Sequence, residues 1–158
     1  MVSVGDAAPD FTAPVANGEV EQFTLSDNLD DAPLVLAFFP AAFTGTCTHE
    51  LQTFDDRLAE FRDHGAAVYG VSVDTPFALD AFRDDLGLSF GLISDTNRRL
   101  VEAYDVRTDF ASIGVDDLAK RAVFVVDGDG IVRFAWASDD PGIEPDYDEI
   151  YDAVATLA

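Results

Sequence analysis

The chain has 158 residues, of which 48% are hydrophobic, and this composition predicts one folded domain spanning residues 1–158. Its 31 acidic and 9 basic residues give a formal net charge of −22, which argues against binding to nucleic acids or to anionic membrane surfaces, since both are themselves negatively charged. No apolar run approaches the length of a transmembrane helix, so we expect no membrane association.

The acidic residues are spread along the whole chain and do not form a tail. This distribution favours adaptation to a salt-rich cytoplasm over a basic partner, because salt at ~1 M shortens the Debye length to ~3 Å and screens the self-repulsion. We therefore expect a halophilic protein. One cysteine allows no internal disulfide, and the first residues lack the basic and apolar regions of a signal peptide. Both features predict a cytoplasmic location.

The first third of the chain predicts two short extended segments followed by a strand and a helix. A turn at Asn17–Gly18 joins the two extended segments. The apolar run from Leu34 to Phe39 has the length and aromatic content of a buried strand and ends at Pro40. Apolar residues three or four apart then predict a helix that continues to His64.

The rest of the chain alternates between strand and helix patterns. We expect strands at 67–73 and 90–93, helices from 76 to 86 and from 94 or 95 to about 104, a strand pair at 122–126 and 131–137, and a helix at 146–158. Residues 105–119 show no clear period and predict a loop. This order of elements predicts an α/β fold with helices flanking a sheet.

The single cysteine, Cys47, lies in the first turn of the predicted helix, directly after the first buried strand. Free backbone N–H groups and the positive end of the helix dipole favour a thiolate at such a position. A lone cysteine is more often a small buried core residue, however, and its position alone does not separate the two interpretations.

The residues around Cys47 carry a more specific signal. The spacing Pro40-x-x-x-Thr44-x-x-Cys47, within FFPAAFTGTCTHE, resembles the active-site signature of the peroxiredoxins, which are thiol peroxidases. The segment APDFTAP near the N-terminus also resembles the peroxiredoxin N-terminal extension. The nearest subgroups are the one-cysteine E-type alkyl hydroperoxide reductases and the bacterioferritin-comigratory (Q-type) peroxiredoxins. The resemblance implies a thioredoxin-like fold with that extension and a central mixed sheet flanked by helices.

The resemblance also implies a set of catalytic residues. Cys47 would attack hydrogen peroxide or an alkyl hydroperoxide, and the Thr44 hydroxyl would contact both the sulfur and the peroxide. Arg121, in the sequence KRAVFVVDGDG, would stabilise the thiolate and donate to the peroxide. Pro40 would shield the sulfur from water, and Gly45 would let the backbone approach the substrate closely. The resemblance implies no metal, flavin or haem.

Two further polar residues lie close to Cys47 in the sequence. Glu50 is three residues later, where its charge would oppose a thiolate, so we expect it to pair with Arg121 and to orient the guanidinium without acting as an acid or base. His49 is two residues from Cys47, and helical spacing turns it away, which predicts an exposed side chain or an indirect role.

The product of the expected reaction is a sulfenic acid at Cys47. Many Q-type members have a second cysteine five residues later, and this chain has Gln52 there. An external thiol, either a small molecule or a thioredoxin- or glutaredoxin-like protein, would therefore reduce Cys47. We also expect a homodimer, as is common in the family. The alternative is a thioredoxin-fold redox-sensing or chaperone-like binding protein without rapid turnover.

Overall fold

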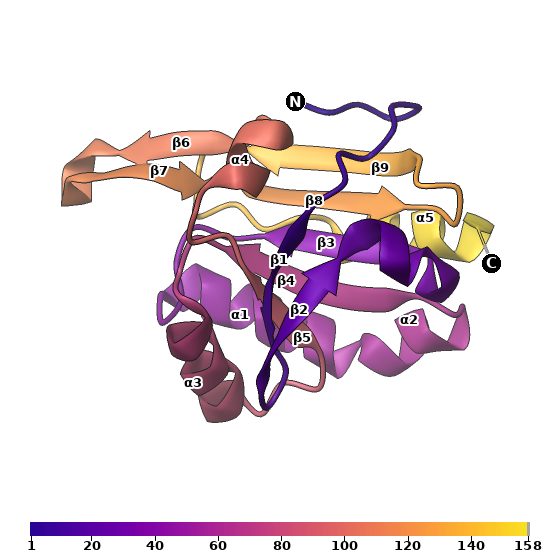
Figure 1. The fold of residues 1–158 in the computed structure, drawn as a ribbon, viewed down its shortest axis with the longest axis horizontal. Helices are drawn as coiled ribbons and strands as arrows, with labels where there is room; N and C mark the ends of the chain where they lie inside the picture. The colour runs from indigo at the N-terminus through magenta and orange to yellow at the C-terminus, as the bar shows by residue number, and fades with distance from the viewer. Residues whose placement is uncertain (158) are drawn as a thin grey trace.

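The computed structural model describes residues 1–157, which form a seven-stranded mixed sheet in the order β2-β1-β5-β4-β3-β8-β9 (Figure 1). Three neighbouring strands run parallel: β3 (Leu34–Phe38), β4 (Ala67–Ser72) and β5 (Gly91–Ser94). The strands outside them pair antiparallel with their neighbours and are β1 (Thr12–Ala16), β2 (Val20–Thr24), β8 (Arg121–Val126) and β9 (Val132–Ser138). The predicted α/β class and central mixed sheet are confirmed.

Helices cover both faces of the sheet. One face packs against residues of α1 (Gly45–Asp56), α2 (Leu58–Asp63), α3 (Pro76–Leu86) and α5 (Tyr147–Leu157). The other face packs against α4 (Arg99–Ala103) and the short 3₁₀ segment η1 (Leu25–Asp31). Every residue of β3 is buried, and successive residues alternate between the two cores, which is why this strand is apolar throughout.

The position of Cys47 follows from how β3 ends. The chain leaves the strand at Phe38, passes through Pro40 and an irregular loop in which Phe43 has a φ of +65°, and enters α1 at Gly45. Thr44, the N-cap residue, has extended backbone angles. Cys47 therefore lies in the first turn of a helix that follows a central strand, as the sequence predicted.

The prediction of a loop at residues 105–119 was wrong. This segment is a two-stranded antiparallel hairpin made of β6 (Arg107–Phe110), the short 3₁₀ segment η2 (Ala111–Ile113) and β7 (Val115–Ala119), and it extends to one side of the sheet in Figure 1. The pairing shifts register between Thr108 and Phe110. That shift interrupts the two-residue alternation by which a strand is recognised in a sequence.

Two predicted helices are shorter than expected. The helix predicted to continue to His64 is interrupted at Arg57, which separates α1 from α2. The helix predicted from residue 94 or 95 begins at Arg99, because Arg98 has a φ of +60°. The Asp95 carboxylate accepts hydrogen bonds from the N–H groups of Leu100 and Val101, so this acidic residue holds the start of α4 from outside the helix.

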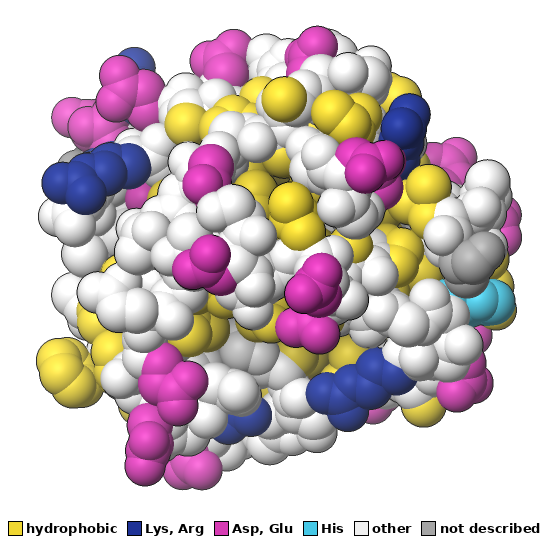
Figure 2. Space-filling model, turned by 45° about the vertical axis from the view of Figure 1, so that its right-hand side comes forward, with side chains coloured by type: hydrophobic (Ala, Val, Ile, Leu, Met, Phe, Trp, Pro, Cys, Tyr) yellow, Lys and Arg dark blue, Asp and Glu magenta, His cyan; other side chains and the backbone are white. Residues whose placement is uncertain are grey.

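The predicted hairpins at 17–18 and 127–130 are present, since β1 pairs with β2 and β8 with β9. The predicted last helix corresponds to α5, and Ala158 lies outside the described residues. Among residues 1–157, no helix combines the length and the apolar character needed to cross a membrane. Figure 2 shows acidic side chains scattered over the face of the molecule in view, with few basic ones between them.

Candidate active site

Cys47 is held inside the protein at the end of the sheet. Its side chain is 1% exposed and belongs to the core between the sheet and α1. The first helical N–H of α1 with a backbone acceptor is that of Thr48, which donates to the Thr44 carbonyl oxygen at 2.9 Å. The N–H groups of Gly45, Thr46 and Cys47 precede it and have no acceptor within the helix, so they can bind oxygen atoms brought to this turn.

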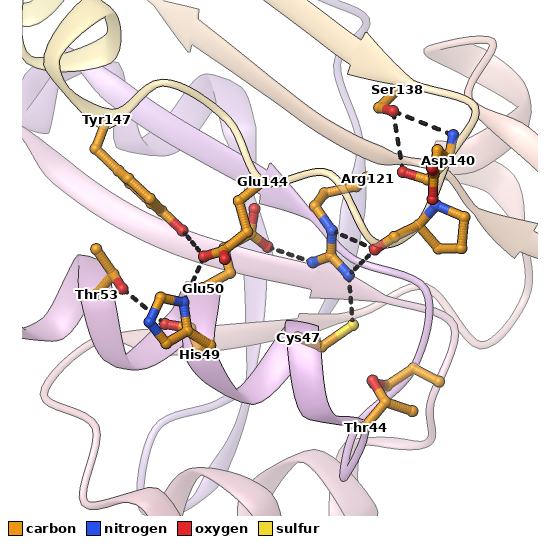
Figure 3. Close-up of polar contacts among 12 residues, drawn as sticks. Thr44, Cys47, His49, Glu50, Thr53, Arg121, Ser138, Asp140, Glu144 and Tyr147 are labelled. Atoms are coloured by element: carbon orange, nitrogen blue, oxygen red, sulfur yellow. Dashed lines mark hydrogen bonds and ion pairs between the residues drawn. The ribbon is translucent and has the colours of Figure 1, made fainter.

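Arg121 comes from β8, which pairs with β3. Because Ala122 lies opposite Phe38, Arg121 is placed beyond the end of β3, beside the loop that leads to α1. Its Nη2 atom is 3.1 Å from the Cys47 Sγ atom, and its Nη1 atom donates to Glu50 Oε1 at 3.0 Å (Figure 3). Cys47 and Arg121 are 74 positions apart in the sequence, and the structure brings them together with Glu50, as predicted.

A backbone carbonyl holds the other side of the guanidinium. The Pro141 oxygen accepts hydrogen bonds from Nε of Arg121 at 3.1 Å and from Nη2 at 2.8 Å. Arg121 is 1% exposed, and its guanidinium is held by partners on two segments, α1 and the connection between β9 and α5. The contact with Pro141 could not be predicted from the sequence, because it uses a main-chain oxygen that every residue has.

Glu50 is buried completely, at 0% exposure. Its Oε1 atom accepts the Arg121 hydrogen bond, whereas its Oε2 atom has no hydrogen-bond partner among the described residues. Burial raises the pKa of Glu50 to about 8, and this effect outweighs the attraction of Arg121, which lowers the pKa. The predicted Glu50–Arg121 pair is present, but the carboxyl group is far less acidic than an ordinary glutamate.

A second carboxylate lies on the outer side of this group. Glu144 Oε1 accepts a hydrogen bond from the Tyr147 hydroxyl at 2.6 Å and lies 2.6 Å from His49 Nδ1. The His49 side chain is 68% exposed, in agreement with the prediction that it turns away from Cys47. Figure 3 shows these residues on the side of Glu50 away from the sulfur. The sequence analysis did not identify Glu144 or Tyr147, because they belong to a distant loop and to α5.

Thr44 lies at the mouth of the site, with its hydroxyl directed elsewhere than predicted. The hydroxyl donates to the Ala41 carbonyl oxygen at 2.8 Å and not to the sulfur. This bond stabilises the loop before α1 and leaves the oxygen lone pairs of Thr44 available as acceptors. Pro40 and Gly45 both line the adjacent cavity, where the resemblance placed them.

The cavity beside Cys47 has a volume of about 380 Å³. One wall is made by the loop before α1 and its first turn, and another by Pro141 and Gly142. The hairpin β6–β7 supplies the third wall through three apolar residues, Phe110, Ile113 and Leu118. A buried sulfur, a guanidinium and free backbone N–H groups thus meet at the end of a largely apolar cavity, an arrangement suited to binding a small polar group with an apolar substituent.

Comparison with known proteins gives a consistent result. The model of the AhpC/TSA family matches residues 4–135. Alkyl hydroperoxide reductase E of Mycobacterium bovis is 36% identical over 159 residues, covering 99% of each chain. A chloroplastic 2-cysteine peroxiredoxin of Chattonella marina var. antiqua is 38% identical over 140 residues, covering 84% of this chain and 69% of the relative.

Solved structures agree with the sequence relatives. The crystal structure of peroxidoxin BcpB from Mycobacterium tuberculosis matches with a TM-score of 0.85 and 28% identity, covering 100% of this chain and 99% of that chain. AhpC of Enterococcus faecalis matches with a TM-score of 0.86 and 25% identity, covering 99% of this chain and 92% of that chain. Both matches extend over the hairpin β6–β7 as well as the central sheet, since nearly the whole chain is covered.

Proposed function

This chain belongs to the AhpC/TSA family of peroxiredoxins, and we propose that Cys47 is the residue with which it attacks a peroxide. The protein is a thiol-dependent peroxidase, an oxidoreductase that reduces hydrogen peroxide or alkyl hydroperoxides. The observation that carries the assignment to Cys47 is the 3.1 Å contact between its sulfur and the buried guanidinium of Arg121 at the end of the cavity.

The chemistry follows from the groups that meet there. The Cys47 thiolate attacks one peroxide oxygen, an S–O bond forms, and the O–O bond breaks with its electron pair passing to the leaving oxygen. Arg121 stabilises the thiolate and the negative charge that moves along the S–O–O line. The free N–H groups at the start of α1 are donors for the same oxygens, and their fixed orientation avoids reorganisation during the reaction.

The remaining residues of the site have supporting roles in this proposal. Pro40 excludes water from one side of the sulfur, and Gly45 keeps the first turn of α1 open to the substrate. Thr44 accepts a hydrogen bond from the peroxide through its lone pairs, because its proton is already donated to the Ala41 carbonyl oxygen. The apolar wall made by the hairpin β6–β7 contacts the organic substituent of an alkyl hydroperoxide.

The sulfenic acid formed at Cys47 is reduced by an external thiol, either a small molecule or a thioredoxin- or glutaredoxin-like protein, because the chain has no second cysteine. Enzymes recycled in this way need a reducing compartment, which supports a cytoplasmic location. A homodimer is also part of the proposal. Its support is the exposed apolar surface around the cavity, where Phe43 is 61%, Ile113 66% and Ile143 51% exposed.

Rapid mixing with hydrogen peroxide tests the proposal. Fluorescence of the single tryptophan, Trp136, follows oxidation in molar KCl, with Cys47→Ser as the blank. We expect Arg121→Met to slow the reaction by about 10²–10³-fold, the usual loss for a preorganised donor, and the exposed Arg99→Met to leave it unchanged. A wild-type rate equal to that of free cysteine would refute a peroxidase role for Cys47 and would favour a redox sensor instead.

A further inference from the structure

Glu50 is a buried acidic group that the reaction described above leaves without a task. One of its oxygens faces Arg121, and the other, Oε2, has no hydrogen-bond partner among the described residues. Burying an ionised carboxylate with an unpaired oxygen costs more free energy than burying a neutral carboxyl group. The same conclusion follows from the pKa of Glu50, which burial raises to about 8.

The decisive feature is that two acidic groups depend on one cation. Arg121 donates to Glu50 through Nη1 and to Cys47 through Nη2. If both acidic groups are ionised, the buried set of Arg121, Glu50 and Cys47 carries a net charge of −1. If neither is ionised, it carries +1, and a guanidinium that is 1% exposed has no anionic partner. The set is neutral when one of the two groups is ionised, which is the least costly state in a buried site.

The other titratable groups nearby favour the same outcome. The charge of Glu144, in the connection between β9 and α5, raises the pKa of Glu50 further. Tyr147 on α5 donates its proton to Glu144, and His49 on α1 contacts the same Glu144 oxygen from its exposed position. Neither side chain brings a second cation to Glu50 in the buried interior. A thiolate at Cys47 therefore makes ionisation of Glu50 less favourable, because one guanidinium would then have to compensate two negative charges.

We propose that Glu50 holds a proton while Cys47 is a thiolate and releases it when the sulfur becomes a sulfenic acid, so that Arg121 exchanges one anionic partner for the other. This inference rests on the proposed attack by Cys47. The reaction is balanced as thiolate plus protonated Glu50 plus ROOH giving sulfenic acid, ionised Glu50 and ROH. The sulfur is oxidised, the O–O bond is reduced, and the proton required by the leaving oxygen is matched by the one that Glu50 gives up.

Glu50 is in this view a positioning residue that acts through Arg121 and not a group that touches the peroxide. It sets the charge around the guanidinium at each stage of the reaction. The exchange is largest somewhat above the pKa of Glu50, where the carboxyl group ionises beside a neutral sulfur but the added charge of a thiolate keeps it protonated.

Infrared difference spectroscopy tests the exchange directly. Spectra of the reduced protein and of the protein after complete oxidation of Cys47 by one equivalent of hydrogen peroxide are subtracted, in molar KCl, at several values between about pH 7 and 9. We expect the C=O band of a protonated carboxyl group to be lost on oxidation. The band should be missing from the difference spectrum of Glu50→Gln and present in that of Glu19→Gln, an exposed control.

Proton counting gives a second readout. In weakly buffered solution with an indicator dye, wild type should take up close to no protons per sulfur oxidised at about pH 9, while Glu50→Gln should take up close to one. A carboxyl band that is unchanged at every pH, or equal proton uptake by both proteins, would overturn the inference. The spectra are taken after complete oxidation and therefore do not depend on its rate. Slow oxidation would argue against the proposed function, whereas an unchanged carboxyl band would argue against the role of Glu50.

Discussion

Replacing Arg121 by methionine should make the stability of the protein depend on pH in a way that identifies Glu50 as the cause. We consider the change in a Cys47→Ser background, in which no thiolate can form beside Glu50. The substitution removes the two hydrogen bonds from the Arg121 guanidinium to the Pro141 carbonyl, and the loss of hydrogen bonds to a charged group costs about 1–3 kcal/mol. This loss does not depend on pH. Glu50 also loses its partner but avoids a larger cost by remaining protonated.

The sign of the pH dependence follows from the raised pKa of Glu50. The folded state holds this proton up to about pH 8, whereas the unfolded chain releases it near 4.5, so the free energy of unfolding falls as the pH rises between these values. In the parent protein the fall ends near pH 8. In Arg121→Met the pKa is higher still, and the fall continues at about 1.4 kcal/mol per pH unit beyond pH 8.

Urea unfolding at about pH 7 and pH 9 measures the difference. We expect the deficit of Arg121→Met to be about 1–3 kcal/mol at the lower pH and at least about 1 kcal/mol larger at the higher one. Adding Glu50→Gln should make the deficit equal at both values. An Arg121→Met deficit that is the same at both pH values, with Glu50 intact, would show that Arg121 does not compensate the buried carboxyl group.

Three further outcomes are expected. Ile113→Ser should slow the reaction with an aromatic organic hydroperoxide by several-fold more than with hydrogen peroxide, because Ile113 lines the cavity; Phe77→Ser, exposed outside it, is the control. The melting temperature should rise between low salt and ~1 M KCl, because salt screens a net charge of −22, and an unchanged value would contradict the halophilic interpretation. Asp95→Ala should lower the free energy of unfolding by about 1–2 kcal/mol in urea titrations, because two N–H groups at the start of α4 lose their acceptor, whereas Asp129→Ala should have little effect.

The sequence predicted the parts of the fold that depend on local patterns. β3 is apolar at every position and ends at proline, so its limits and burial were predictable. The start of α1 was equally clear, because the apolar spacing begins just after Cys47. The hairpin β6–β7 was missed since its strands are half-exposed and their register shifts, which hides the alternation.

The resemblance of the sequence motifs to those of the family predicted which residues form the candidate site. Cys47, Arg121 and Glu50 meet as predicted, although the pairing of β3 with β8 that unites them is not visible in the sequence. The direction of the Thr44 hydroxyl was not predictable, because it depends on the path of the loop before α1. The raised pKa of Glu50 could not be predicted either, because it is caused by burial among residues from distant segments.

The contact between Arg121 and the Pro141 carbonyl has a consequence for how this protein tolerates sequence change. A main-chain oxygen survives any side-chain replacement in the connection between β9 and α5, so exposed residues there, such as Ile143, can vary freely. An inserted or deleted residue would instead shift the carbonyl away from the guanidinium. Among homologous chains, variation in this connection should therefore appear as substitutions, while its length stays constant.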